Sequence, residues 1–200
     1  PGDIFYQQAH LLERAGNFVK VLGGGSITAL PIIELNLNDF TTYIPTNLMA
    51  MTDGHLLIRS SLFTRGQRPA VDLSLSVSRV GHQTQNPLQN SLATRIKQVL
   101  ASGTQLETVS RFSFELPTET QLILKQHDLI SHLLRQAPLT PYPLQYQVIL
   151  LSLPFTKFVE KFTAEDSENL TKKPAFVNLA QNVFRIKSLD QLFAEVEKIL

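Results

Sequence analysis

A single arginine ends the most chemically informative segment of this chain. Residues 73–78 read Leu-Ser-Leu-Ser-Val-Ser, a short β-type run, and Arg79, Val80 and Gly81 follow directly. A guanidinium is always charged and can donate to two phosphate oxygens at once, whereas a lysine offers a point charge. In phosphoryl transfer negative charge builds on the equatorial oxygens, so a positioned arginine can stabilise the transition state. The residues alone favour the commoner role of a lone arginine after a strand, a surface or ion-pair residue.

The remaining residues with catalytic or ligand chemistry form no strong motif. The run Gly23–Ser26 lacks the Gly-Lys-Ser/Thr ending of a phosphate-binding loop and precedes an apolar run rather than a helix, so we predict a flexible loop. His127 and His132 stand five residues apart and therefore do not share a helical face. The chain has no cysteine, which excludes disulfides and thiolate ligands. The sequence predicts no metal site in this chain.

The composition is that of a globular protein. Hydrophobic residues make up 43% and charged residues 18% of the 200 residues, which is enough to build a sizeable core. Eighteen basic and 17 acidic residues give a formal net charge of +1, so we expect no basic surface for nucleic acid. No apolar run approaches the roughly 20 residues of a membrane-spanning helix, and no transmembrane segment is predicted.

Helices and strands alternate in the part of the chain that would position Arg79. An apolar stripe of helical period predicts a helix from Asp3 to Ala15, and the apolar run Ile27–Ile33 predicts a strand covered on both faces. The further elements expected here are a helix at 46–51, a strand at 55–58, a short helix at 60–64 and a strand at 71–77. This alternation predicts α/β structure with a parallel, doubly wound sheet.

Apolar residues follow only the helical period beyond residue 85. Asn86–Pro87 interrupts the chain, and residues 165–173 are expected to form a polar surface connection. Helices are expected from Ser91, from a capping box at Thr118–Gln121, over Tyr146–Leu153 and from a cap at Ser188. We therefore predict two domains, an α/β part over residues 1–85 and a helical bundle over residues 86–200.

Several short motifs resemble the alpha subunit of F-type rotary ATP synthases. The resemblance is dense over residues 1–81 and then rests on spacing and on a few positions such as Gln136. Secretion and flagellar export ATPases are similar at Thr52-Asp-Gly54, whereas Tyr43-Ile-Pro-Thr-Asn47 favours the synthase. The motifs that carry the resemblance are Pro1-Gly-Asp-Ile-Phe-Tyr6, Leu11-Leu-Glu-Arg-Ala15, Gly24-Gly-Ser-Ile-Thr-Ala-Leu-Pro-Ile-Ile-Glu34, Arg68-Pro-Ala70 and Ser76-Val-Ser-Arg-Val-Gly81.

The resemblance implies that this chain acts on a nucleotide held by another subunit. It implies the last part of a RecA-like nucleotide-binding domain followed by a C-terminal helical domain, in a non-catalytic alpha subunit that alternates with beta subunits around the gamma stalk and contacts the peripheral stalk. Arg79 would be an arginine finger on the beta-bound nucleotide. In the family, the lysine-bearing loop and the magnesium-binding aspartate precede the segment that matches Pro1-Gly-Asp3. The residues that bind the phosphates of ATP or ADP and the Mg²⁺ ion would therefore lie on an N-terminal alpha fragment or on beta. The isolated chain would not be catalytic.

The resemblance also implies an adenine pocket. Phe63, Arg68 and Gln136 match the positions that line this pocket in the subunit's own non-catalytic site. An aromatic face can pack on a purine, an arginine can add a cation–π contact, and a glutamine amide can donate and accept at the adenine edge. From the residues alone, Phe63 would instead be a core residue, Arg68 an ion-pair partner and Gln136 a surface residue.

Three departures from the family pattern keep a second hypothesis open. Pro138 stands where the family has another glutamine at the adenine edge, Gln83–Asn90 is neutral where the family carries lysines, and Phe112–Pro117 keeps only Glu115 of the acidic pattern in a loop that reaches toward the rotor. The alternative is a structural scaffold derived from this subunit that has lost nucleotide function.

The beginning of the chain and the resemblance together predict its setting. The chain starts at Pro1 without a methionine or a targeting segment, so we expect a processed or split piece that pairs with an N-terminal alpha fragment. The resemblance implies a peripheral location on the matrix side of the mitochondrial inner membrane, with the plastid thylakoid or the bacterial plasma membrane as alternatives.

Overall fold

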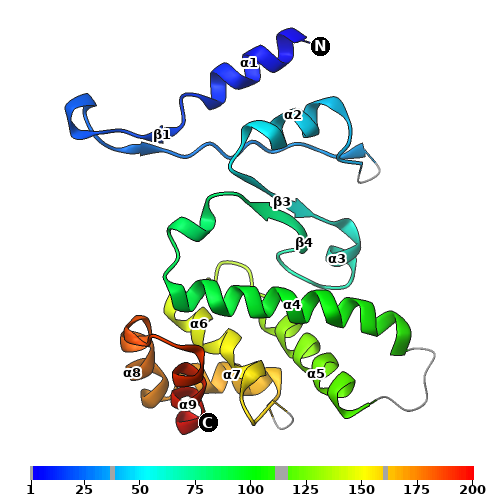
Figure 1. Cartoon of the computed structure of the whole chain (residues 1–200), viewed down its shortest axis with the longest axis vertical. Helices are drawn as coiled ribbons and strands as arrows, with labels where there is room; N and C mark the ends of the chain where they lie inside the picture. Colours follow the sequence, from blue (N-terminus) through cyan, green and yellow to red (C-terminus); the bar gives the residue numbers. More distant parts are fainter. Residues whose placement is uncertain (1, 37–38, 111–116, 160–161) are drawn as a thin grey trace. The chain divides into compact units, whose positions relative to one another are not determined.

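The computed structural model describes residues 2–36, 39–110, 117–159 and 162–200 (Figure 1). They group into two compact units. The first unit comprises residues 1–56 with 76–80, and the second comprises residues 57–75 with 81–200. The domain boundary near residue 85 stays a prediction, because compactness alone does not define a domain.

The first unit holds two helices and a small hairpin. Its elements are α1 (Gly2–Leu12), β1 (Gly16–Asn17), the 3-10 turn η1 (Lys20–Leu22), β2 (Ser26–Ile27) and α2 (Tyr43–Met51). The rings of Phe5 and Tyr43 lie 6.4 Å apart, and the Asn47 amide donates to the Gln8 side chain at 2.9 Å, so α1 and α2 pack against each other. The helices predicted near residues 3–15 and 46–51 are confirmed, with shifted ends.

The glycine run forms the turn of the β1–β2 hairpin. Gly23, Gly24 and Gly25 have φ angles of 97°, 70° and 88°, which L-residues with a Cβ rarely adopt. The amide of Phe18 donates to the carbonyl of Gly25 at 2.9 Å, and β1 and β2 pair antiparallel with Gly16 opposite Ile27. The glycines therefore form the turn of the hairpin, in the segment where the sequence predicted a loop.

The strand predicted over residues 27–33 is wrong in its extent. Only Ser26–Ile27 is strand, and residues 28–35 have no sheet partner among the described residues. The side chains of Leu30 and Ile32 are 81% and 95% exposed. A strand needs a neighbouring edge for its backbone hydrogen bonds, and no described segment supplies one here.

A second two-stranded sheet consists of β3 (Gly54–Ile58) and β4 (Val71–Ser78). The amide of Arg79 donates to the carbonyl of Asp53 at 2.7 Å, and the amide of Arg59 donates to the carbonyl of Ala70 at 3.0 Å. The beginning of β3 thus lies opposite the end of β4, so the strands run antiparallel. The described strands do not form the expected parallel sheet, because the β3–β4 connection turns back through the short helix α3 (Ser60–Thr64) instead of crossing over the sheet.

The rest of the second unit is helical, as predicted. The helices are α4 (Pro87–Ser110), α5 (Thr118–Leu133), α6 (Leu144–Ser152), α7 (Ala164–Thr171), α8 (Pro174–Asn182) and α9 (Leu189–Ile199), with 3-10 turns at η3 (Gly81–Gln83), η4 (Leu153–Phe155) and η5 (Val183–Arg185). None of the helices in the described ranges combines the length and the apolar content needed to cross a bilayer. Of the segment Phe112–Pro117, which was predicted to be a loop reaching toward the rotor, residues 112–116 lie outside the described residues.

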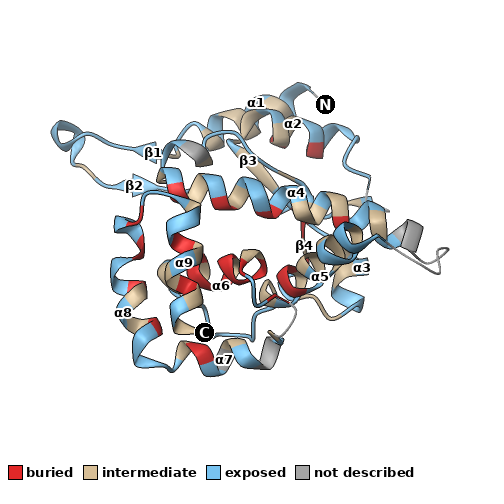
Figure 2. Cartoon of the chain, turned by 60° about the horizontal axis from the view of Figure 1, so that its bottom comes forward, coloured by how far each residue is buried: buried red, intermediate tan, exposed pale blue. Residues whose placement is uncertain are grey.

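The hydrophobic core of the second unit surrounds α6. Ile149 is fully buried, and so are Ile130 from α5, Phe176 from α8 and Leu192 from α9. Figure 2 shows buried residues gathered on α6 and on the faces of α9, α8 and α4 that turn inward. Apolar residues of helical period predicted the faces of α4 and α9, whereas no helix was predicted over α8.

Helices α4 and α5 approach closely at one glycine. A Cβ added at Gly103 would lie 2.5 Å from the ring of His127, so the ring occupies the space that a side chain would need. The residue types at this crossing therefore set the spacing of the two helices.

The predicted helix caps have mixed outcomes. The Ser188 hydroxyl accepts from the Gln191 amide at 3.3 Å, which confirms the cap of α9. Helix α5 has Pro117 as its N-cap and no capping side chain, so the box predicted at Thr118 is wrong. Residues 165–173 are not a loop, because Thr163 and Asp166 form a capping box that starts α7.

Candidate functional site

Arg79 stands at the end of β4, where the strand is pinned to the beginning of β3. The Arg79 amide donates to the Asp53 carbonyl, and Gly54 lies against Val77, where a Cβ would overlap the Val77 carbonyl oxygen. Only a residue without a side chain allows this close approach. The backbone that carries Arg79 is therefore held against the beginning of β3.

The guanidinium of Arg79 binds the last turn of α2. Its Nη1 donates to the carbonyl of Ala50 and its Nη2 to the carbonyl of Met49, both at 3.0 Å. The last carbonyls of a helix lack intrahelical donors and lie at the negative end of the helix dipole, so a cation is favourable there. A guanidinium has five N–H donors, and within the described ranges of the chain three of them have no further acceptor beyond these two hydrogen bonds. Because Arg79 is exposed, it combines a fixed position with unused donors.

Phe63 and Arg68 are brought together by the end of α3. The amide of Gly66 donates to the Phe63 carbonyl and that of Gln67 to the Leu62 carbonyl, both at 3.0 Å, and Gly66 has a φ angle of 81°. This pattern is a Schellman motif, which reverses the chain after a helix. The Arg68 guanidinium consequently lies 4.5 Å from the centre of the Phe63 ring.

Gln136 joins this pair through its backbone. Its amide donates to the Arg68 carbonyl at 2.7 Å, and its side chain is exposed in the segment that follows α5. The structure thus brings together the three residues predicted for the adenine pocket. Phe63 is 55% exposed and is not the core residue that sequence reasoning offered as its alternative.

The arrangement restricts where a purine could bind. One face of Phe63 is covered by the Arg68 guanidinium, so a base would stack on the outer face of that guanidinium or on the other face of the ring. Pro138 lies in a turn in which the Thr140 amide and hydroxyl both donate to the Ala137 carbonyl. Since proline has no backbone N–H, Pro138 offers a base no donor.

A polar cluster around the buried Asp72 of β4 was missed by sequence reasoning. The Asp72 carboxylate, in β4, accepts from Arg59 Nη1 at 3.0 Å and from the Ser74 hydroxyl at 2.5 Å. Burial raises the pKa of Asp72, but the hydrogen bonds from Ser74, Arg59 and the Leu75 amide outweigh burial and hold that pKa below its usual value. An aspartate between apolar residues of a strand was the available signal, since aspartate is depleted in strands.

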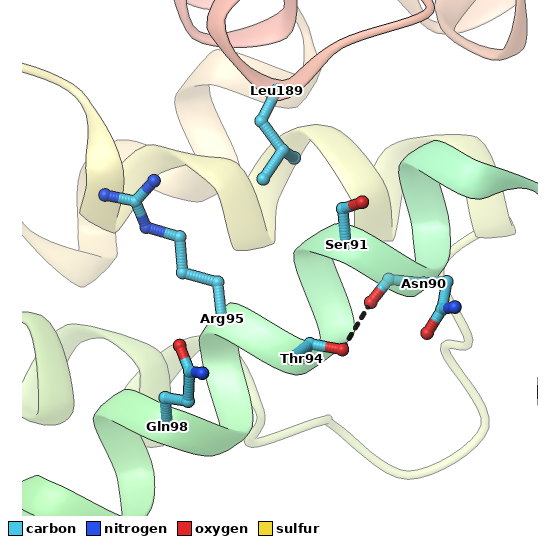
Figure 3. A pocket seen from close by; sticks show the side chains of 6 residues that line it. All are labelled: Asn90, Ser91, Thr94, Arg95, Gln98 and Leu189. Atoms are coloured by element: carbon cyan, nitrogen blue, oxygen red, sulfur yellow. Dashed lines mark hydrogen bonds between the residues drawn. The ribbon is translucent and has the colours of Figure 1, made fainter.

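An open groove lies between α4 and the beginning of α9 (Figure 3). It has a volume of about 520 Å³ and contains none of the predicted site residues. Its lining residues are Asn90, Ser91, Thr94, Arg95, Gln98 and Leu189. Within the described part of the chain, no group of three or more histidine or acidic side chains is arranged to hold a metal ion.

The family model and two relatives that match this chain all belong to ATP synthases. Residues 1–78 match the ATP synthase alpha/beta family, nucleotide-binding domain. The chain is 44% identical over 153 residues to ATP synthase subunit alpha of Mesomycoplasma hyopneumoniae strain 7448, which covers 76% of this chain and 30% of that protein. It is 35% identical over 190 residues to ATP synthase subunit alpha of Orientia tsutsugamushi strain Boryong, which covers 95% of this chain and 36% of that protein.

These matches test the predicted succession of an α/β part and a helical part along the chain. The chain spans about a third of the length of these relatives. The nucleotide-binding match over residues 1–78, followed by the helices from α4 onward, confirms the predicted succession of an α/β part and a helical part.

Proposed function

We propose, from the premise that this chain belongs to the F-type ATP synthase alpha subunits, that it forms the C-terminal part of a non-catalytic alpha subunit in a ring with beta subunits. The observation that carries the proposal is the setting of Arg79. Its backbone, just after β4, is hydrogen-bonded to Asp53 just before β3, and among the described residues only α2 carbonyls accept from its guanidinium, which uses two of its five donors for them. A cation held in this way loses little side-chain entropy when it meets a phosphate.

Arg79 would act on a nucleotide bound by the neighbouring beta subunit. In ATP synthesis the oxygen of ADP attacks phosphate and water leaves, and charge accumulates on the equatorial oxygens of the transferred group. Donors of Arg79 that α2 does not use would bind these oxygens most strongly in the transition state. The chain would thus belong to a proton-transporting ATP synthase while lacking catalytic activity by itself.

The first test is Arg79→Lys in the assembled ring. An arginine finger contributes about 10³–10⁵ in rate, roughly 4–7 kcal/mol of transition-state stabilisation. Lysine keeps the charge and can still donate to the α2 carbonyls, so assembly and nucleotide binding at the first site should persist while multisite turnover collapses. Steady-state ATP hydrolysis and native mass spectrometry measure the two properties.

Arg14→Lys is the matched control, because Arg14 is an exposed arginine that no prediction places at a nucleotide. It should turn over ATP at the parent rate. If Arg79→Lys rings do so as well, Arg79 is only the cap of α2 and the arginine-finger proposal is wrong.

Phe63, Arg68 and Gln136 would hold the adenine of a nucleotide that is bound and not turned over. What supports this proposal is their convergence and the exposed ring of Phe63. These residues fit only the base, so the phosphates and Mg²⁺ would be held by the N-terminal part of an alpha subunit. Phe63→Ala should weaken nucleotide occupancy by about 1–3 kcal/mol, as for bases stacked on aromatic residues.

Phe184→Ala is the control for that measurement, since Phe184 is an exposed ring in another part of the second unit. Nucleotide retained by purified rings would be quantified after denaturation. Unchanged content in Phe63→Ala would favour the second candidate, a scaffold without nucleotide function. Pro138 and the guanidinium that covers one face of Phe63 are the observations that favour the scaffold.

The partners and location follow as parts of the same proposal. Residues 28–33 are exposed and have no sheet partner among the described residues, and an N-terminal alpha fragment would cover them. Beta, gamma and peripheral-stalk subunits would complete the assembly. Its location would be peripheral to the mitochondrial inner membrane on the matrix side, with the plastid thylakoid or the bacterial plasma membrane as alternatives.

A further inference from the structure

Arg95 is an unusually placed cation in the groove between α4 and α9. Its guanidinium lies 5.0 Å from the ring centre of Phe155 and 5.6 Å from that of Phe193. The two rings are themselves stacked, with centroids 5.8 Å apart. No carboxylate of the described residues forms an ion pair with Arg95. The rings orient the guanidinium while its N–H groups remain at its edge.

The surface around Arg95 is polar and carries positive charge. In Figure 3, Leu189 projects from the beginning of α9 into the space between Arg95 and Ser91, and Gln98 lies one turn further along α4. The Thr94 hydroxyl donates to the Asn90 carbonyl at 2.9 Å and can still accept. No lining residue of the groove is acidic.

The surface continues along α4. A second hollow of about 320 Å³ shares Thr94 and Gln98 with the first and adds Lys97. Its remaining lining residues, Ala93 and Ala101, are small and permit close approach of another backbone. Helix α4 carries no acidic residue before Glu107, and the carboxylate adjacent in sequence to Leu189 belongs to Asp190 on α9.

We propose that this surface docks an acidic segment of another polypeptide, with a carboxylate of that segment bound by the Arg95 guanidinium. An arginine held against two rings can bind a carboxylate through two parallel hydrogen bonds. Because the lining offers two cations and no carboxylate, charge complementarity selects an acidic partner over a basic one. The hydroxyls and amides of the groove would bind the partner's polar side chains or backbone.

The test uses the full chain and a labelled alanine-based helical peptide with glutamate at every fourth position. A matched peptide carries glutamine at those positions. Fluorescence anisotropy should show binding of the glutamate peptide that weakens as salt rises, with binding of the glutamine peptide about tenfold weaker or more. Equal binding of the two peptides, or no binding of the glutamate peptide, would overturn the proposal.

Two variants localise the binding. Arg95→Gln should weaken binding of the glutamate peptide about tenfold or more through loss of the charged hydrogen bonds. Ser91→Glu places a carboxylate four residues before Arg95 on the same helix, where it competes for the guanidinium and supports α4. We therefore expect the Ser91→Glu chain to keep its fold. It tests the groove even if loss of the arginine destabilises the Arg95→Gln chain.

Lys172→Gln is the control, because it removes one exposed cation outside the groove. It should bind the glutamate peptide with the affinity of the parent chain. Parent-level affinity in Ser91→Glu, or an equal loss in Lys172→Gln, would reject the Arg95 groove as the docking site and leave only nonspecific attraction to cations.

Discussion

The first 80 residues and the helical residues that follow use apolar side chains in opposite ways. Among the described residues, 20 of the 25 exposed large apolar side chains lie in residues 1–80, whereas 17 of the 20 buried apolar residues lie after residue 86. In the helical part, the apolar faces of the helices pack against one another around α6. The earlier part has apolar segments without a partner in the described chain. The comparison teaches that an apolar run specifies a buried position only when the same molecule supplies its cover.

The strongest way to break this comparison is to separate the two regions. We expect residues 86–200 to unfold cooperatively when expressed alone, because their core is formed within that range. Residues 1–85 alone should be insoluble or partly molten, and co-expression with an N-terminal alpha fragment should rescue them. Urea unfolding followed by circular dichroism provides the measurement. A cooperative transition for residues 1–85 alone would contradict the comparison.

Two isoleucines make a matched pair for the same contrast. Ile130 is fully buried and Ile32 is 95% exposed. In the full chain, Ile130→Ala should lower the free energy of unfolding of the helical part by about 2–5 kcal/mol, and Ile32→Ala should change it by less than about 0.5 kcal/mol. If an N-terminal fragment covers Ile32, the Ile32 variant should weaken that association. Equal losses of stability in the two variants would show that residues 28–33 are already packed.

Near the β3–β4 sheet, we expect the hydrogen bonds of Asp72 to supply part of the stability that buried apolar residues supply in the helical part. Asp72→Asn removes the charge that Arg59 and Ser74 bind and should destabilise the chain by about 1–3 kcal/mol. The pKa of Asp72 is lowered on folding, so its contribution is present above the usual carboxyl value of about 3.9 and is lost as the pH falls through the lower folded value. Unfolding between pH 3 and pH 7 should show this loss in the parent chain. The Asp72→Asn substitution should remove that part of the pH dependence, and an unchanged profile would contradict the role given to Asp72.

The smallest expected effect concerns the turn that returns Arg68 to Phe63. Gly66 has a φ angle of 81° and open space where a Cβ would stand. Gly66→Ala should therefore cost about 1–2 kcal/mol through backbone strain alone. Gly16→Ala, at a glycine without a positive φ angle, is the control and should be nearly neutral. Thermal unfolding measures both variants, and a neutral Gly66→Ala would reject the Schellman geometry.

Elements whose signals are local could be predicted from residue type and spacing. Periodic apolar residues predicted the faces of α4, α5 and α9, and α3 begins and ends at the predicted residues, Ser60 and Thr64. The cap at Ser188 also followed from residue type and spacing. Such signals survive because a helix satisfies its own backbone hydrogen bonds.

Other features depended on what each segment meets. The run Ile27–Ile33 has the composition of a buried strand, yet strand pairing needs an edge from elsewhere in the chain. Residues 165–173 are polar, and the capping box at Thr163 still starts a helix whose Leu170 is buried. Composition does not report such a contact.

Only the tertiary structure decided how the candidate site residues are held. Motif resemblance selected Arg79, Phe63, Arg68 and Gln136, but α2 supplies the carbonyls that bind Arg79, and the turn at Gly66 sets Arg68 on Phe63. The groove at Arg95 needed three segments, because its cation comes from α4 and its rings from η4 and α9. A residue's type determines which bonds it can form, whereas the groups that the fold brings within reach decide which of those bonds exist.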